Sequence, residues 1–307
     1  MSNQATSFRE VALANLGLLL VVITWGAFFP ILELLLSYWD FYSATVARQI
    51  CGAIVLSCCV FLLSGRERLP TPMPWARILI LGGVGVSIGS LMTSAGVLLS
   101  TGLSAAIIST TNPIGSALTA AAVYREPLGR GLVIATLLSV VGGLISVAGG
   151  QSLGSAHFEG GEILIVLANV LWTWMSIAAQ RWLRGFSQLQ IAAVTVASGA
   201  LWLIIAMPFF VASGLVSIRV EWSILPLSLI AFAGIVPIAI GNVCWHYGVS
   251  RVGVVVASMY NNLLPAAALA TTVLLGGSFT WYQVLGSLVI IAGVLGVQIA
   301  SARRRRG

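Results

Sequence analysis

Long apolar runs separated by short polar links constrain this chain more than any other feature. Hydrophobic residues make up 59% of the 307 positions and charged residues only 7%, and the mean hydropathy is +1.03. A soluble domain of this length could not bury that much apolar surface, whereas a lipid bilayer solvates it. The composition therefore predicts an all-α protein that crosses a membrane many times.

A helix needs roughly 20 apolar residues to cross the hydrocarbon core of a bilayer. The chain offers ten such segments, and the short links between them carry proline, glycine and other turn residues. The predicted transmembrane helices are 11–36, 41–63, 77–99, 103–123, 131–150, 161–180, 187–211, 223–248, 253–275 and 281–301. Links this short place consecutive helices side by side and antiparallel, and they leave no room for a soluble domain.

The distribution of arginine predicts the orientation of these helices. If the N-terminus is inside, almost every arginine in a link faces the cytoplasm, and so do the four from Arg303 to Arg306. Only Arg219 falls in an outer link, and Arg48 lies within the second segment. The positive-inside rule therefore predicts that both termini are cytoplasmic, which requires an even number of helices. Because the arginines sit at the ends of apolar segments and not on one aromatic-rich face, we expect no nucleic-acid partner.

The ten predicted helices divide into two sets of five on either side of an outer link at 151–160. A unit with an odd number of helices must enter the membrane upside down relative to its copy. We therefore expect one five-helix repeat over 11–150, a second and inverted repeat over 160–301, and a basic tail at 302–307. Many secondary transporters are built in this way, with a substrate site near the midplane between the halves.

Several short motifs resemble the EamA-type repeat of the drug/metabolite transporter superfamily. They are Trp25-Gly26, Arg48, the Glu126-Pro127-Leu128 turn and the series Pro265, Gly276, Thr280, Gly286 and Gly293. The resemblance covers about 11–150 and 160–300, although Gly277 stands where the family usually has a glutamate. Within the superfamily, the stretch from Leu171 to Trp174 and Trp245 are most similar to aromatic amino-acid exporters. The resemblance implies an exporter in the cell (inner) membrane.

Polar and aromatic residues recur at one depth in four predicted helices. At about 1.5 Å per residue, the midplane holds Trp25 in the first, Asn112 and Pro113 in the fourth, and Asn169 in the sixth. Asn261, Asn262 and Pro265 reach the same depth in the ninth helix. A proline within a span frees a backbone carbonyl, which membrane proteins tolerate where the backbone lines a cavity. We therefore expect a midplane cavity, although the asparagines could instead join helices through hydrogen bonds.

Asparagine can bind both an ammonium and a carboxylate without adding a fixed charge, and tryptophan or tyrosine offers a flat apolar face. We expect the cavity to be uncharged. The predicted substrate-binding residues are Trp25, Ser109, Asn112, Pro113, Asn169, Trp172, Trp245, Tyr260 and Asn262. Two charged residues lie nearer the outer side, Glu33 and Arg48, and they could form a structural ion pair or gate the outer vestibule.

The sequence thus predicts a carrier that exports amino acids, aromatic or otherwise apolar, by alternating access between two inverted halves. It would act as a monomer in contact with membrane lipid and a small-molecule substrate. An exporter of another metabolite or drug, and less readily a channel, are the alternatives. Transport could be facilitated or proton-coupled, and the lack of a titratable carboxylate at the midplane favours facilitated transport. Two histidines and eight scattered acids suggest no enzyme, and four cysteines inside apolar segments suggest neither a metal nor a cofactor.

Overall fold

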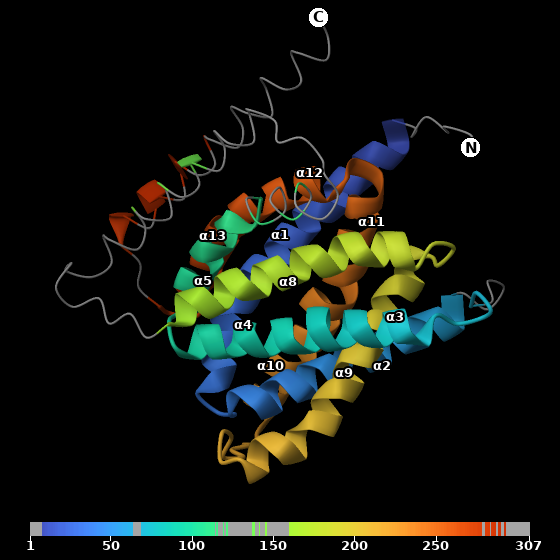
Figure 1. Cartoon of the computed structure of the whole chain (residues 1–307). Coiled ribbons are helices and arrows are strands. Elements are labelled where there is room, and N and C mark those ends of the chain that lie inside the picture. The colour runs from blue at the N-terminus through green and yellow to red at the C-terminus, as the bar shows by residue number, and fades with distance from the viewer. Residues whose placement is uncertain are drawn as a thin grey trace, which may run out of the picture.

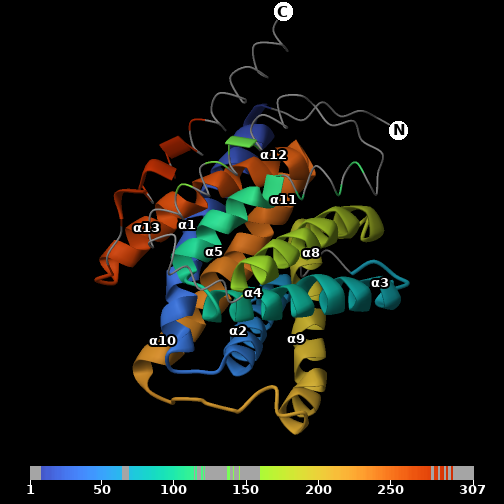
Figure 2. The ribbon, with the colours of Figure 1, turned by 60° about the vertical axis from the view of Figure 1, so that its left-hand side comes forward.

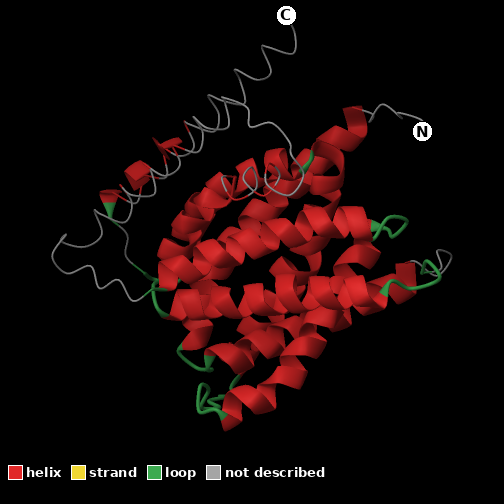
Figure 3. Ribbon diagram, viewed as in Figure 1, coloured by secondary structure: helices red, strands yellow, loops and turns green. Residues whose placement is uncertain are grey.

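The computed structural model describes residues 8–63, 69–113 and 160–277, with scattered positions between 115 and 145 and between 280 and 292. Within these residues every regular element is a helix and no strand occurs (Figure 3). Among the described helices, seven are long and apolar enough to cross a membrane. The prediction of an all-helical, multi-pass membrane protein is therefore confirmed.

The first four predicted segments contain seven described elements. These are α1 (Phe8–Leu36), α2 (Phe41–Leu63), α3 (Trp75–Ile80), the π-helix η1 (Leu81–Ile88), α4 (Gly89–Leu98), α5 (Gly102–Ile108) and the 3-10 helix η2 (Ser109–Thr111). The predicted helix ends agree with these bounds to within a few residues. The later part of the fourth segment and most of the fifth, 131–150, lie outside the described residues.

The sixth to ninth predicted segments contain eight described elements. These are α8 (Gly161–Trp182), α9 (Gln188–Ala212), α10 (Ile224–Ala233), the π-helix η3 (Gly234–Gly241), α11 (Asn242–Val252), α12 (Val254–Met259), the 3-10 helix η4 (Tyr260–Leu263) and α13 (Leu264–Leu274). The tenth predicted segment, 281–301, lies mostly outside the described residues. The total of ten helices therefore stays a prediction.

Capping residues explain why several helices begin where they do. The carboxylate of Asp40 accepts hydrogen bonds from the backbone amides of Tyr42 and Ser43, which start α2. The hydroxyl of Thr101 accepts from the amide of Ser104 at the start of α5, and Ser187 forms a capping box at the start of α9. These side chains satisfy amides that have no partner inside the helix. The short polar links thus end one membrane helix and begin the next.

The same departures from α-helical geometry recur at corresponding places in the two halves. The third and eighth segments each contain a π-helix of eight residues, η1 and η3. The fourth and ninth each contain a 3-10 helix, and each 3-10 helix is followed two residues later by a proline, Pro113 or Pro265. Such irregular turns inside a span often mark functional sites, because they change which backbone groups are engaged.

Helices from opposite halves pack against each other throughout the bundle. The long helix α1 packs against α11 and α13, while α8 packs against α4, η1 and α5 (Figures 1 and 2). Likewise α2 packs against α9 and η3, and α9 packs against η1. Each half thus supplies a long helix that the other half surrounds. This arrangement places the middle of α1 and the middle of α8 on either side of one central space.

Candidate functional site

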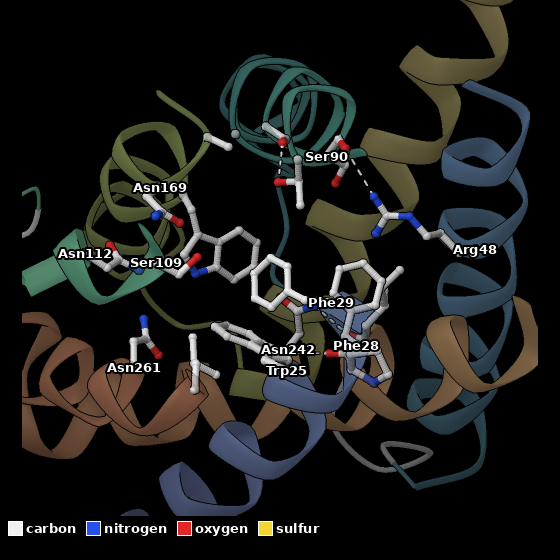
Figure 4. Close-up of a pocket in the computed structure, with 18 of the residues that line it drawn as sticks. Trp25, Phe28, Phe29, Arg48, Ser90, Ser109, Asn112, Asn169, Asn242 and Asn261 are labelled. Carbon is white, nitrogen blue, oxygen red and sulfur yellow. Dashed lines mark hydrogen bonds between the residues drawn. The ribbon is translucent and has the colours of Figure 1, made fainter. Parts of the chain in front are cut away.

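A cavity of about 130 Å³ lies between the two sets of helices (Figure 4). It has room for several water molecules, since one needs on the order of 10–15 Å³ of such space. Its walls come from α1, α2, α4 and α8, from η1 and η3 with the start of α11, and from η2 and η4 with the residues that follow them. The lining residues are Trp25, Phe28, Phe29, Arg48, Gln49, Gly85, Gly89, Ser90, Thr93, Ser109, Asn112, Ala168, Asn169, Trp172, Pro237, Ile238, Asn242, Asn261 and Leu264.

The middle of the cavity is aromatic. The ring of Trp25 meets that of Trp172 edge to face, with 5.4 Å between centroids, and also packs against Trp245, with 5.2 Å between centroids. Phe28 and Phe29 follow Trp25 by three and four residues, so they lie on the same side of α1 and extend this wall (Figure 4). Such a wall suits an apolar or aromatic group, because flat rings contact it face to face or edge to face.

One end of the cavity carries amide and hydroxyl groups from three helices. Ser109, Asn112, Asn169 and Asn261 gather there (Figure 4). The side-chain oxygen of Asn112 accepts a hydrogen bond from the hydroxyl of Thr173 at 2.8 Å. By contrast, Nδ2 of Asn169 and Oδ1 of Asn261 are buried without a hydrogen-bond partner in the described structure. Unpaired buried polar groups are costly, so these atoms lack hydrogen bonds that a ligand or water could supply.

The opposite end carries a positive charge, which corrects the expectation of an uncharged cavity. Arg48 is only 3% exposed and points toward Ser90 on α4 (Figure 4). Its Nη2 donates to the carbonyl oxygen of Ser90 at 3.2 Å and to Oγ of Ser94 at 3.1 Å. Its guanidinium carbon lies 5.0 Å from the centroid of the Phe28 ring. Composition alone could not reveal this charge in the cavity, because the direction in which Arg48 points depends on the rotation of α2 about its own axis.

Glu33 and Arg48 do not form the predicted ion pair in the described structure. The carboxylate of Glu33 instead accepts a hydrogen bond from the backbone amide of Gly102, at 2.8 Å. This puts a negative charge at the start of α5, where the helix dipole and the unpaired amides favour it. The two residues therefore serve different helices, and a gating role for either stays a prediction.

Five of the predicted binding residues line the cavity, and four lie elsewhere. Those that line it are Trp25, Ser109, Asn112, Asn169 and Trp172. Of the others, Trp245 packs behind Trp25 and donates to the hydroxyl of Ser176, and the hydroxyl of Tyr260 donates to Asn15 on α1. Pro113 is buried next to the lining residue Asn112. Asn262 is also buried, and its neighbour Asn261 takes the place in the cavity wall that was expected for it.

Several lining residues were not predicted as binding residues. They include Phe28, Phe29, Gln49, Ser90, Thr93 and Asn242. A helical spacing of three and four residues from Trp25 could have indicated Phe28 and Phe29. Ser90 and Asn242 lie just after η1 and η3, and the extra residue in a π-helical turn rotates the face that follows it. No α-helical pattern in the sequence could have shown that rotation.

No metal site is present among the described residues, in which no group of three histidine, cysteine, aspartate or glutamate side chains could hold an ion. The cavity is instead a binding space made of aromatic rings, amides and one guanidinium. Residues from both halves of the chain build it. Such a lining can contact both polar and apolar groups of a small molecule.

Comparison with known proteins agrees with this description. The chain is 22% identical over 275 residues to an uncharacterized transporter of Bacillus subtilis, with 88% of each chain covered. It is 24% identical over 286 residues to a probable terminal-alkyne amino-acid exporter of Streptantibioticus cattleyicolor, with 92% of this chain and 90% of that protein covered. A crystal structure at 19% identity superposes with a TM-score of 0.68 over 96% of this chain and 99% of its own, which shows the same fold.

The model of the EamA-like transporter family matches the chain twice, over residues 12–148 and 159–299. Together these matches leave only the termini and a short link uncovered. The protein is a multi-pass membrane transporter and belongs to the EamA-like transporter family.

Proposed function

We propose that this protein exports amino acids with aromatic or other apolar side chains. The observation that carries the proposal is the composition of the cavity. Its aromatic wall, Trp25, Phe28, Phe29 and Trp172, suits an apolar side chain. Its uncommitted polar atoms, such as Nδ2 of Asn169 and Oδ1 of Asn261, suit the charged groups of an amino acid.

The name of one relative points the same way. The Streptantibioticus cattleyicolor protein is named as a probable terminal-alkyne amino-acid exporter, and it aligns with nearly the whole of this chain. An amino acid with an apolar side chain needs the same two kinds of contact that the cavity offers. The name of this relative, which is 24% identical, thus supports an amino acid as the substrate. The cavity offers a physical reason why an amino acid with an apolar side chain would bind.

Transport would proceed by alternating access between two inverted halves, 11–150 and 160–301. The π-helices η1 and η3 occupy corresponding positions, and so do the 3-10 helices η2 and η4, which supports two related halves. Because both halves line the cavity, rocking one against the other would open the site to alternate sides of the membrane. The protein would work as a monomer in the cell (inner) membrane with both termini in the cytoplasm, as its arginine distribution favours.

Uptake of labelled phenylalanine into liposomes that contain the purified protein tests this proposal. We expect uptake above that of empty vesicles and saturation with concentration, because a carrier moves one substrate per cycle. A flux that does not saturate would indicate a channel. A competition panel of amino acids, other metabolites and cationic drugs separates an amino-acid exporter from another member of the family, and an imposed pH gradient separates facilitated from proton-coupled transport. Absence of amino-acid uptake under all these conditions would refute the proposal.

A further inference from the structure

Two neighbouring residues of α2 share a hydrogen-bond partner, Ser90 of α4, at the charged end of the cavity. Nη2 of Arg48 donates to the carbonyl oxygen of Ser90 at 3.2 Å, and Nε2 of Gln49 donates to its hydroxyl oxygen at 2.6 Å. Both side chains are 3% exposed and both line the cavity. Their positions are therefore set by the packing of α2 against α4 before any substrate enters.

Each of these two side chains keeps one buried polar atom without a partner in the described structure. In Arg48 this atom is the donor Nε, and in Gln49 it is the acceptor Oε1. The hydrogen bonds of Arg48 to Ser90 and Ser94 both use Nη2, so Nε is left as an uncommitted donor. A buried polar atom without a partner costs about 1–3 kcal/mol, and more when the group is charged. The charged end of the cavity thus has one uncommitted cationic donor and one uncommitted acceptor, the two kinds of partner that the head group of an amino acid needs.

The charge of Arg48 also lacks a counter-ion in the described structure. None of the residues that line the cavity is an aspartate or glutamate, and Glu33 is engaged by Gly102. An isolated charge inside a membrane protein is expensive and usually pairs with an opposite charge. A carboxylate fits best, because it brings the opposite charge and can accept a charge-assisted hydrogen bond from Nε.

We propose that Arg48 and Gln49 form the subsite for the head group of an α-amino acid. The carboxylate binds Arg48, the ammonium donates to Oε1 of Gln49, and the side chain extends along Phe28 toward Trp25 and Trp172. This inference rests on the proposed function and deepens it, since it moves the head group from the amide end to the charged end. The amide end, with Asn112, Asn169 and Asn261, then lies beyond the far end of the substrate side chain, where water can pair with its uncommitted amide atoms.

The proposal predicts selectivity for molecules that carry both charges. A ligand without a carboxylate leaves Arg48 unpaired and brings an ammonium close to a positive charge. A ligand without an ammonium leaves Oε1 of Gln49 unpaired. Binding sites built around polar partners discriminate strongly against analogues that lack them, because the partners of the missing group stay buried and unsatisfied.

Ligand-dependent thermal unfolding of the purified full-length protein in detergent tests this subsite. The probes are phenylalanine, phenethylamine, which lacks the carboxylate, and 3-phenylpropionate, which lacks the ammonium. The dissociation constant follows from the dependence of the melting temperature on ligand concentration. We expect wild-type protein to bind phenylalanine at least about 10-fold more tightly than either analogue, as expected for one lost charge-assisted contact.

Substitutions assign each charge to its residue. Arg48→Gln should weaken the binding of phenylalanine at least about 30-fold, because it removes the partner of the carboxylate. It should also abolish the preference for phenylalanine over phenethylamine. Arg48→Lys keeps the positive charge and loses the planar guanidinium, so it should weaken the binding of phenylalanine by an intermediate factor. It replaces Arg48→Gln as the test if that variant does not fold. Gln49→Met keeps the side-chain volume and should make 3-phenylpropionate bind as well as phenylalanine. Arg251→Gln, at an exposed ion pair with Glu10, is the matched control and should bind all three as wild type does.

The outcomes separate this inference from the proposed function. If wild-type protein binds phenylalanine no more tightly than the two analogues, or if Arg48→Gln and Arg48→Lys both bind it as wild type does, the subsite is refuted. If the binding preferences hold but liposomes show no uptake, the subsite stands and the proposed transport fails. If uptake is observed and is insensitive to Arg48, transport stands and the head group binds elsewhere.

Discussion

The indole Nε1 of Trp25 donates a hydrogen bond to the backbone carbonyl oxygen of Pro237, 3.0 Å away. This contact joins α1 of the first half to the π-helix η3 of the second, at the edge of the cavity. The same indole also contacts the rings of Trp172 and Trp245. Trp25 therefore both forms part of the cavity wall and connects the two halves.

Replacing Trp25 by phenylalanine keeps an aromatic ring in the wall and removes the donor to Pro237. We expect the variant to be destabilised by about 1–2 kcal/mol, the cost of one buried hydrogen bond. Transport should fall several-fold, because η3 loses a contact that positions it. Thermal unfolding and phenylalanine uptake measure the two effects. Trp75→Phe, at a side chain that is 63% exposed, is the control, and equal behaviour of both variants would contradict this role for Trp25.

Trp172→Ala removes the edge-to-face partner of Trp25 and opens one wall of the cavity. We expect a loss of uptake of at least about 10-fold with normal insertion into the membrane, since a hot-spot aromatic contact commonly contributes 2 kcal/mol or more to binding. Trp174→Ala is the matched control, because Trp174 lies on the same helix but packs against Trp182 outside the cavity. Unchanged uptake in Trp172→Ala would show that Trp172 only supports packing.

Glu33→Gln tests whether this carboxylate supports the fold or gates transport. Its contact with the amide of Gly102 predicts a loss of stability of about 0.5–1 kcal/mol, typical of an anion at a helix N-terminus. Uptake should keep its wild-type affinity, because Glu33 does not line the cavity. A large change in uptake with an unchanged melting temperature would instead support the gating alternative.

Gly26→Ala tests the close approach of α1 and α13. A Cβ at Gly26 would overlap the Cβ of Ala267 and lie 2.8 Å from the carbonyl oxygen of Leu264, so the helices would have to separate. We expect a destabilisation of about 1–3 kcal/mol, as for other overpacked sites. In the control Gly17→Ala, on the same helix, the nearest atom lies 3.6 Å away and is in ordinary contact. Thermal unfolding of both variants decides, and equal melting temperatures would contradict the packing argument.

Much of the site could be anticipated from depth along the predicted helices. Trp25, Asn112, Asn169 and Trp172 lie at similar depth in their helices, and the structure brings all four to one cavity. Depth alone could not decide whether Asn261 or Asn262 faces the cavity, because adjacent residues of a helix lie at nearly the same depth and point to different sides of it. The 3-10 geometry of η4 decides which of the two faces the cavity.

The sequence by itself determined that this chain forms membrane helices, where the described ones begin and end to within a few residues, and which family it belongs to. These properties follow from local requirements, because a bilayer demands about 20 apolar residues per helix with every backbone group bonded internally. Only the tertiary structure decided which polar groups meet. Arg48 reaches Ser90 and Ser94 on α4, and Glu33 reaches Gly102 on α5, because the rotation of each helix depends on π-helical turns and on close contacts between small residues. Those contacts join residues far apart in the chain, so no local pattern encodes them.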